Sequence, residues 1–374
     1  MAATQIYLDH NASTPIDPSV RAAMTPYLAA AFGNPSSGHW AGVPAREAVE
    51  AARARVAALL GCAPDEVVFT SGGTEANNAA LTGVFFSAAG RSRHIVTALI
   101  EHPAIIEPCH FLERLGATVT YVGVDSTGMV DPGDIRRALR PDTVLVSVMH
   151  ANNEVGTIQP LAEIAAITRE AGVPLHSDAA QSVGKLDTDV NALGVDLLSM
   201  AAHKFYGPKG VGALYVRRGL RLEPFMHGAS HESGRRAGTE NVLLDVGLGA
   251  AAELARDRAW TDAVLELRDR FWVALQDRFG DLVRLNGHPT ERLCNTLSVD
   301  FVGRVGSEIL AALPGVAAST GSACHADRVT LSSVLEAMRV PPEVGMGAVR
   351  FSLGRSTTWA ELDAVTGGLA TALA

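Results

Sequence analysis

The stretch VDLLSMAAHKFYGPKGVG, residues 195–212, decides the fold. Its first six residues are mostly apolar and predict a buried strand. Lys204 follows two alanines and a histidine and precedes an aromatic pair and a Gly/Pro turn. Most lysines are exposed charges, but a lysine that follows an apolar strand must be paired, have a lowered pKa or act as a covalent partner. Lys204 is therefore the first candidate for a reactive side chain.

An acid stands one predicted strand upstream of Lys204. The short apolar strand at residues 173–177 is followed directly by Asp178 and then by Gln181, while His203 precedes the lysine. A lysine and an acid placed in this way are typical of pyridoxal phosphate sites, in which lysine holds the cofactor as a Schiff base and the acid keeps the ring nitrogen protonated. This arrangement is the working hypothesis for function.

A second stretch, residues 67–76, predicts an anion-binding turn. A β-branched and aromatic strand runs into Gly72 and Gly73, and a helix opens at Thr74. Unpaired N–H groups and the positive end of the helix dipole favour a phosphate at such a turn. The GxxxxGK[ST] pattern of nucleotide-binding P-loops is absent, so this anion-binding turn is not a P-loop.

Strand and helix patterns alternate over most of the chain and predict an α/β fold with a mostly parallel, doubly wound sheet. Polar residues follow the ends of four strands, and because ligands bind beyond the carboxyl ends of such strands, we expect these residues to share a site. They are Thr70-Ser71, Glu101-His102, Asn152-Asn153 and Asp178. Further predicted strands span residues 94–100, 118–122, 143–149, 195–200 and 211–216, and helices span residues 103–115, 132–139 and 161–171.

The length of 374 residues predicts two domains. We expect a large cofactor-binding domain over residues 15–255 and a smaller α/β domain from residues 1–14 and 256–374. One long helical pattern, residues 244–275, leads into the smaller domain, where strands at 296–301 and 348–353 alternate with helices at 306–313 and 331–338. Residues 6–15 begin as a strand and then become polar, which predicts a segment laid across a site.

Composition excludes several classes of partner. A net charge of −9 without a basic tract argues against direct nucleic-acid binding. No apolar stretch is long enough to span a membrane. The cysteines are widely spaced, without a C-x-x-C pair, and no secretory signal pattern is present, so we expect a cytoplasmic protein. His227 and His231 lack a third ligand nearby, and we expect no metal site.

One cysteine differs from the others. Cys62, Cys109 and Cys294 stand at apolar or helical positions and are expected to be inert. Cys324 lies in the small, polar stretch STGSACHADR at residues 319–328. Its neighbours predict an exposed thiol, and a nearby histidine or arginine would favour the nucleophilic thiolate.

With these residues in view, the chain resembles the cysteine desulfurases of the class V aminotransferase group, which have the type I fold of pyridoxal phosphate enzymes. The resemblance covers nearly the whole length. It is carried by YLDHNASTP at 7–15, FGNPSS at 32–37, FTSGGTE at 69–75, HANNE at 150–154, DAAQS at 178–182, HKFYGPKG at 203–210, RAGTEN at 236–241, GSAC at 321–324 and RFSLGR at 350–355.

The resemblance implies a role for each matching residue. Lys204 would hold pyridoxal 5′-phosphate and Asp178 would face its ring nitrogen. His102 would stack over the ring and move a proton. Gln181 and Asn152 would bond the O3′ side, and Gly73, Thr74 and His203 would hold the phosphate, with Thr239 supplied by the partner subunit of a homodimer. Arg350, assisted by Asn34, would bind the substrate carboxylate.

The implied reaction converts L-cysteine to L-alanine and leaves a persulfide on Cys324. A sulfur-accepting protein, such as an iron–sulfur cluster assembly scaffold or a thiolation enzyme, would then take the sulfur.

Two departures leave alternatives open. Ala201-Ala202 replace hydroxyl residues that usually help to bind the phosphate, so we expect weaker cofactor binding. His325 and Asp327 are similar to the run found in selenocysteine lyases, so release of selenide from L-selenocysteine is the main alternative. An aminotransferase would give Cys324 no role, and a sulfur-carrier scaffold would need no cofactor.

Overall fold

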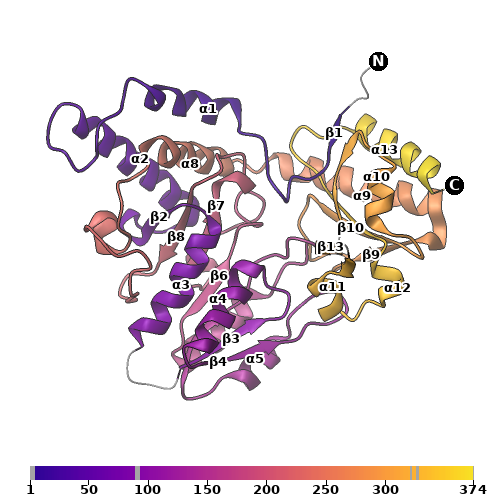
Figure 1. The fold of residues 1–374 in the computed structure, drawn as a ribbon, viewed down its shortest axis with the longest axis horizontal. Helices are drawn as coiled ribbons and strands as arrows, with labels where there is room; N and C mark the ends of the chain where they lie inside the picture. Colours follow the sequence, from indigo (N-terminus) through magenta and orange to yellow (C-terminus); the bar gives the residue numbers. More distant parts are fainter. Residues whose placement is uncertain (1–4, 89–92, 321, 326–327, 374) are drawn as a thin grey trace.

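The computed structural model describes residues 5–88, 93–320, 322–325 and 328–373, without the side chains of residues 322–325, 328 and 329. Figure 1 shows two lobes, a large one built mainly from the first two thirds of the chain and a smaller one built from the last third. In the described part, no helix is long and apolar enough to cross a membrane.

The large lobe is organised around a seven-stranded sheet in the order β2-β8-β7-β6-β5-β3-β4. These strands are β2 (Val67–Thr70), β3 (Arg93–Ala98), β4 (Ala117–Val122), β5 (Thr143–Ser147), β6 (Leu175–Asp178), β7 (Leu197–Ala201) and β8 (Gly212–Val216). All neighbours pair in parallel except β8, which runs antiparallel to β2 and β7. The mostly parallel sheet is thus confirmed. β8 differs because the chain returns from β7 through a short connection, without the helix that a parallel crossover requires.

Helices cover both faces of this sheet, as a doubly wound fold requires. One core contains side chains of α3 (Gly73–Ser87) and α4 (Pro103–Arg114). The other contains side chains of α1 (Pro18–Met24), α2 (Gly42–Leu60), α5 (Pro132–Ala138), α6 (Leu161–Ala171), α7 (Val190–Leu193) and α8 (Val242–Ala255).

The small lobe has an antiparallel sheet in the order β12-β15-β10-β9. Its strands are β9 (Val283–Asn286), β10 (Thr296–Phe301), β12 (Ser319–Thr320) and β15 (Ala348–Ser352), with α9 (Trp260–Phe279), α10 (Gly306–Ala311) and α13 (Trp359–Ala372) packed around them. Phe271, Phe301 and Phe351 lie at the centre of this core and are fully buried.

The N-terminal segment joins the small lobe before it reaches the large one. β1 (Ile6–Tyr7) pairs with β11 (Val316–Ala317), and Ile6 and Leu8 belong to the small-lobe core. This packing supports the proposed assignment of residues 1–14 to the smaller domain.

The helical pattern predicted over residues 244–275 is interrupted. α8 ends at Ala255 and α9 begins at Trp260. Asp257 accepts a hydrogen bond from the backbone N–H of Ala259 (3.0 Å), and this local turn competes with continued helix.

The backbone around Cys324 forms a hairpin. β13 (Ser322–His325) pairs antiparallel with β14 (Arg328–Leu331), and Cys324 stands opposite Val329. The short helices α11 (Ser333–Ala337) and α12 (Pro342–Gly345) follow. The hairpin is therefore placed between β12 and α11 of the small lobe.

Candidate active site

A cavity of about 380 Å³ lies where the carboxyl ends of the large sheet meet the small lobe. Its volume is within the range of small-molecule sites. Nine residues that the sequence predicted for the site line it: Gly73, Thr74, His102, Asn153, Asp178, Gln181, His203, Lys204 and Arg350. The remaining lining residues include Asn11, Ala12, Asn77 and Ala201. Residues from three of the four predicted strand ends thus converge here. Thr70 and Ser71, at the fourth, line a separate cavity, and Glu101 does not line this one.

Lys204 ends a short 3-10 helix, Ala202–Lys204, directly after β7. Its amine donates hydrogen bonds to the carbonyl oxygens of Asn11 (2.8 Å) and Ala12 (2.9 Å). Burial and the positive charge of Arg350 lower the pKa of Lys204 to about 8, although Asp178 opposes the shift. About one amine in ten is therefore uncharged at pH 7, far more than for an ordinary lysine, and the uncharged form is the one that acts as a nucleophile.

Asp178 ends β6, next to β7, and is buried. One carboxylate oxygen accepts from Asn77 Nδ2 (2.6 Å) and the other from the backbone N–H of Ala180 (2.9 Å). These bonds fix the carboxylate at the cavity wall. A carboxylate held in this way could pair with a positively charged group in the cavity.

The start of α3, where the sequence predicts an anion-binding turn, lies at one end of the cavity. Gly72 caps the helix with a φ of +150°, a conformation that favours glycine. A Cβ at Gly212 would lie 2.8 Å from the Gly72 backbone, so glycine is needed there as well. Gly73 and Thr74 line the cavity with the first N–H groups of the helix, which lack partners inside the helix.

Ala201 lines this end of the cavity in place of a hydroxyl residue. A Cβ on Gly73 would stand 3.4 Å from the Ala201 side chain, so the two positions are close neighbours. Phosphate binding at this end of the cavity would therefore rely on backbone N–H groups and on Thr74 and His203. Weaker cofactor binding stays a prediction.

His102 caps the N-terminus of α4 and lines the cavity. Its Nδ1 accepts a hydrogen bond from the backbone N–H of Ala104 (3.0 Å), so the neutral ring carries its proton on Nε2. Burial, together with Lys204, lowers the pKa of His102 below its ordinary value, while Asp178 opposes this. His102 is therefore a neutral ring with one N–H available to the cavity.

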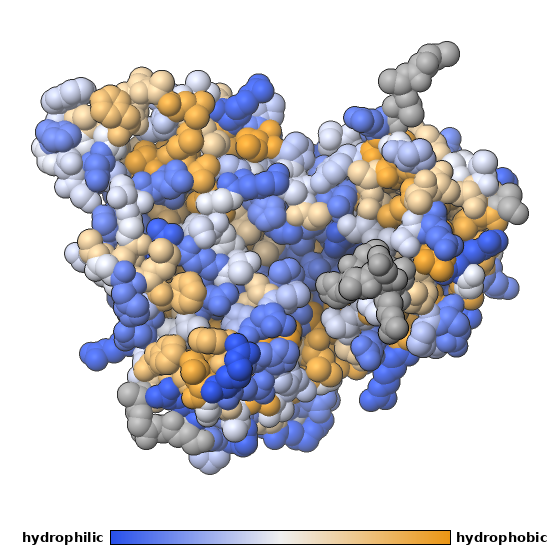
Figure 2. All heavy atoms as spheres, in the orientation of Figure 1, coloured by the Kyte–Doolittle hydropathy of each residue, from blue (hydrophilic) through white to orange (hydrophobic). Residues whose placement is uncertain are grey.

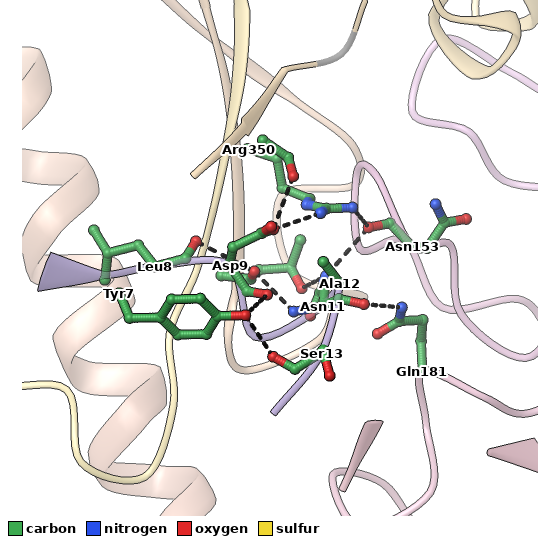
Figure 3. Close-up of polar contacts among 12 residues, drawn as sticks. Tyr7, Leu8, Asp9, Asn11, Ala12, Ser13, Asn153, Gln181 and Arg350 are labelled. Atoms are coloured by element: carbon green, nitrogen blue, oxygen red, sulfur yellow. Dashed lines mark hydrogen bonds and ion pairs between the residues drawn. The ribbon is translucent and has the colours of Figure 1, made fainter. Parts of the chain in front are cut away.

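Arg350, on β15, is the residue through which the small-lobe sheet contributes to the lining of the cavity. Figure 3 shows its guanidinium between Asp9 and Asn153: it donates to Asp9 Oδ1 and to the Asn153 carbonyl oxygen, both at 2.8 Å. Its Nε has no hydrogen-bond partner among the described residues. Arg350 also lines the cavity, so its guanidinium supplies a positive charge that suits an incoming carboxylate.

Three predicted residues lie elsewhere in this chain. The Asn152 side chain is buried and bonds to Ile100 O, Glu154 N and Val155 N, so it braces the turn after β5. Asn34 is exposed in the loop before α2 and does not line the cavity. Thr239 lines a separate cavity of about 230 Å³. Their predicted roles stay predictions.

The side chain of Cys324 lies outside the described residues, as do Gly321 and Asp327. The other three cysteines are free thiols in the described part. Burial raises the pKa of Cys62 and Cys109 to about 12 and raises that of Cys294 as well. These thiols are poor nucleophiles near neutral pH, as their sequence positions predicted.

Sequence reasoning predicted that residues 6–15 lie across a site, but it gave no role to Asp9 or Asn11 and missed Asn77 altogether. Asn77 stands one helical turn after Gly73, and a buried amide on a mostly apolar helix could have been noticed. Asn11 is 1% exposed and acts through its backbone carbonyl as well as its side chain. No residue-type pattern reveals a backbone contact.

Comparison with known proteins gives a consistent result. The family model for class-V aminotransferases matches residues 6–365. The cysteine desulfurase IscS of Dictyoglomus turgidum is 48% identical over 364 residues, which cover 96% of this chain and 92% of that protein. A solved structure described as a NifS-like protein has a TM-score of 0.93 at 36% identity and covers 99% of both chains. Another, described as SspA in complex with cysteine, has a TM-score of 0.84 at 36% identity and covers 95% of this chain and 100% of that one. The chain therefore belongs to the class-V aminotransferase family.

Proposed function

We propose that this protein is a pyridoxal phosphate-dependent cysteine desulfurase, which converts L-cysteine to L-alanine and keeps the sulfur as a persulfide on Cys324. One observation carries the proposal: the Lys204 amine, with a pKa lowered to about 8, shares a cavity with Asp178, and Arg350 lines the same cavity from the small lobe. The relatives named above support it, since one is a cysteine desulfurase and another was solved with cysteine.

The chemistry of the donor set fits the cofactor. Lys204 supplies the amine for its aldehyde, and Asp178 supplies a carboxylate for the ring nitrogen. The N–H groups of Gly73 and Thr74 would hold its phosphate. Asn77 and Ala180 already orient the acid, so that part of the site is preorganised.

The bound cofactor supplies an electron sink for the carbon atoms of the substrate. Arg350 holds the substrate carboxylate and so aligns the Cα–H bond with the site. Lys204, once its amine is free, takes the Cα proton. The His102 Nε2–H would deliver or relay a proton, and its lowered pKa favours the neutral ring.

Sulfur transfer requires a second nucleophile. The Cys324 thiolate attacks the substrate sulfur, an S–S bond forms and the C–S bond breaks, with its electron pair remaining on the former substrate carbon. Protonation of that carbon and return of the proton to Cα by Lys204 then give L-alanine, which leaves with its amino group. One cysteine and one thiol thus become one alanine and one persulfide.

We propose that L-cysteine is a true substrate, so that the protein is not a lyase restricted to L-selenocysteine. The relatives named cysteine desulfurase favour it. The purified protein is expected to form alanine from L-cysteine at a rate comparable to that from L-selenocysteine, with sulfide released when a thiol reductant is present. A protein that turns over selenocysteine but barely acts on cysteine would contradict the proposal. Pyruvate without sulfide would indicate a different reaction.

Replacing Arg350 by alanine is expected to raise the KM for L-cysteine about 10- to 100-fold, with a smaller change in kcat, because charge-assisted hydrogen bonds to the carboxylate are lost. Steady-state kinetics provide the test. Arg355→Ala is the matched control, since Arg355 bonds Asp17 (2.8 Å) and stacks on Tyr206 outside this cavity. An unchanged KM in Arg350→Ala would remove Arg350 from substrate binding.

We also propose that the protein forms a homodimer. Large apolar side chains are exposed around α1 and the loop that follows: Leu28 is 70%, Phe32 74% and Trp40 82% exposed. Figure 2 shows apolar residues gathered over α1 at the upper left. Such a patch is typical of an interface. The position of Thr239 in a separate cavity supports its proposed contribution to the partner's site.

The persulfide implies a protein acceptor with its own nucleophile, such as an iron–sulfur scaffold or a thiolation enzyme. A cytoplasmic location is likewise a proposal. It is supported by the free state of Cys62, Cys109 and Cys294, since disulfides are rare in that compartment.

A further inference from the structure

We infer that Lys185 is a positioning residue, which fixes the orientation of the Gln181 amide so that its N–H group, and not its carbonyl, is presented to the cavity. Gln181 lines the cavity beside Lys204, whereas Lys185 lies behind it and is absent from the lining. The inference rests on the proposed function, because it concerns the oxygen of a cofactor held at Lys204.

Lys185 is a buried amine that the proposed mechanism does not use. It is 7% exposed, and its Nζ donates to the backbone oxygen (2.9 Å) and to the side-chain Oε1 (3.3 Å) of Gln181. A buried amine is costly unless it is hydrogen-bonded. Its bonds to Gln181 are therefore what holds it in place.

The surroundings of Lys185 are mainly positive or neutral. Burial, Lys204 and Arg350 lower its pKa to about 7, and Cys294 opposes them. His10 faces it too, and the charge of Lys185 helps to depress the pKa of that histidine to about 4. Lys185 donates a hydrogen bond in either protonation state.

The Gln181 amide is held from both sides. Its Nε2 donates to the Asn11 carbonyl oxygen (2.9 Å), an atom that also accepts from Lys204 (2.8 Å). Figure 3 shows the Gln181 amide directed at this segment. A carbonyl can only accept, and Lys185 can donate to Oε1, so only one orientation satisfies both neighbours. An inverted amide would place its oxygen against the Asn11 carbonyl oxygen and its N–H group against the Lys185 amine.

This orientation leaves the second Nε2 hydrogen for the cavity. There it would stabilise negative charge on a cofactor oxygen next to Lys204 and so favour loss of the proton that this oxygen shares with the lysine nitrogen. Without Lys185 only the Asn11 carbonyl fixes the amide, so the inverted orientation becomes less unfavourable and more populated. The pH midpoint of the visible absorbance band of the loaded protein is then expected to rise by about one unit, a tenfold change in proton affinity.

The test is a pH titration of that band in the cofactor-loaded protein. Lys185→Met removes the donor and is expected to raise the midpoint, whereas Lys185→Gln keeps a donor without the charge and is expected to stay near wild type. Ser182→Ala is the matched control, because Ser182 is buried in the same turn and its hydroxyl, the group removed, donates to Ala179 O (3.2 Å) and not to Gln181 or Lys185. An equal midpoint in Lys185→Met and wild type would overturn the inference.

A double-mutant cycle separates orientation from charge. If Lys185 acts through the amide, Lys185→Met produces no further shift in a Gln181→Ala background. A full shift in that background would show a direct effect of the lysine charge and would contradict the inference. Should Lys185→Met fail to fold, a raised midpoint in Lys185→Gln would contradict it equally. A wild-type protein without any visible band would instead contradict the proposed function.

Discussion

Cys324→Ala is expected to lower alanine formation from L-cysteine by at least about a thousandfold, because the other three thiols have raised pKa values and are poor acceptors of the substrate sulfur. The cofactor absorbance should stay unchanged, since the cofactor-binding residues lie on other elements. Turnover of cysteine, measured as alanine released, provides the readout.

Cys62→Ala is the control for this experiment. Burial and nearby acids raise the pKa of the Cys62 thiol to about 12, so its removal should leave turnover intact. If Cys324→Ala retained full activity, the persulfide route would be wrong. Equal losses in the two variants would indicate a structural effect of thiol removal.

Lys204→Ala is expected to abolish the covalent attachment of the cofactor and to lower turnover by at least about a thousandfold, because the site then loses both its anchor and its base for the Cα proton. The band that borohydride makes permanent in the wild type should be missing from the variant. Lys209→Ala, at an exposed lysine five residues further along, is the matched control. Covalent attachment retained in Lys204→Ala would assign the anchor to another residue.

The pH dependence of cofactor uptake follows from the same amine. With a pKa of about 8, roughly one Lys204 side chain in ten is uncharged at pH 7, against about one in three thousand for an ordinary lysine. The rate of covalent loading of the apoprotein should therefore rise as the pH increases towards 8 and then level off. A rate still rising steeply at pH 10 would contradict the lowered pKa.

The sequence was most informative at strand ends. Asp178, Lys204 and His102 follow predicted strands, and parallel strands bring their carboxyl ends to one edge. The residue types at these strand ends were therefore enough to identify much of the part of the site that the large lobe contributes. The direction of β8 was beyond the same reasoning, because it depends on how the chain packs after Lys204.

Contacts between distant segments could not be read from the sequence. The Asn11 carbonyl reaches Lys204 across 193 positions, and Arg350 pairs with Asp9 across 341. The sequence also does not show which of two adjacent residues faces a site. Asn152 and Asn153 are the same residue type, yet only Asn153 lines the cavity, while the Asn152 side chain bonds the backbone of the turn after β5. Which of two adjacent side chains faces a site is set by backbone geometry.

The most direct test of the central claim is mass spectrometry of the purified protein after one round of reaction with L-cysteine, without reductant. The account predicts one added sulfur atom on the peptide that contains Cys324, removable by a thiol reductant, and none on the peptides of Cys62, Cys109 or Cys294. Alanine formed in equal amount without sulfur on Cys324 would contradict it.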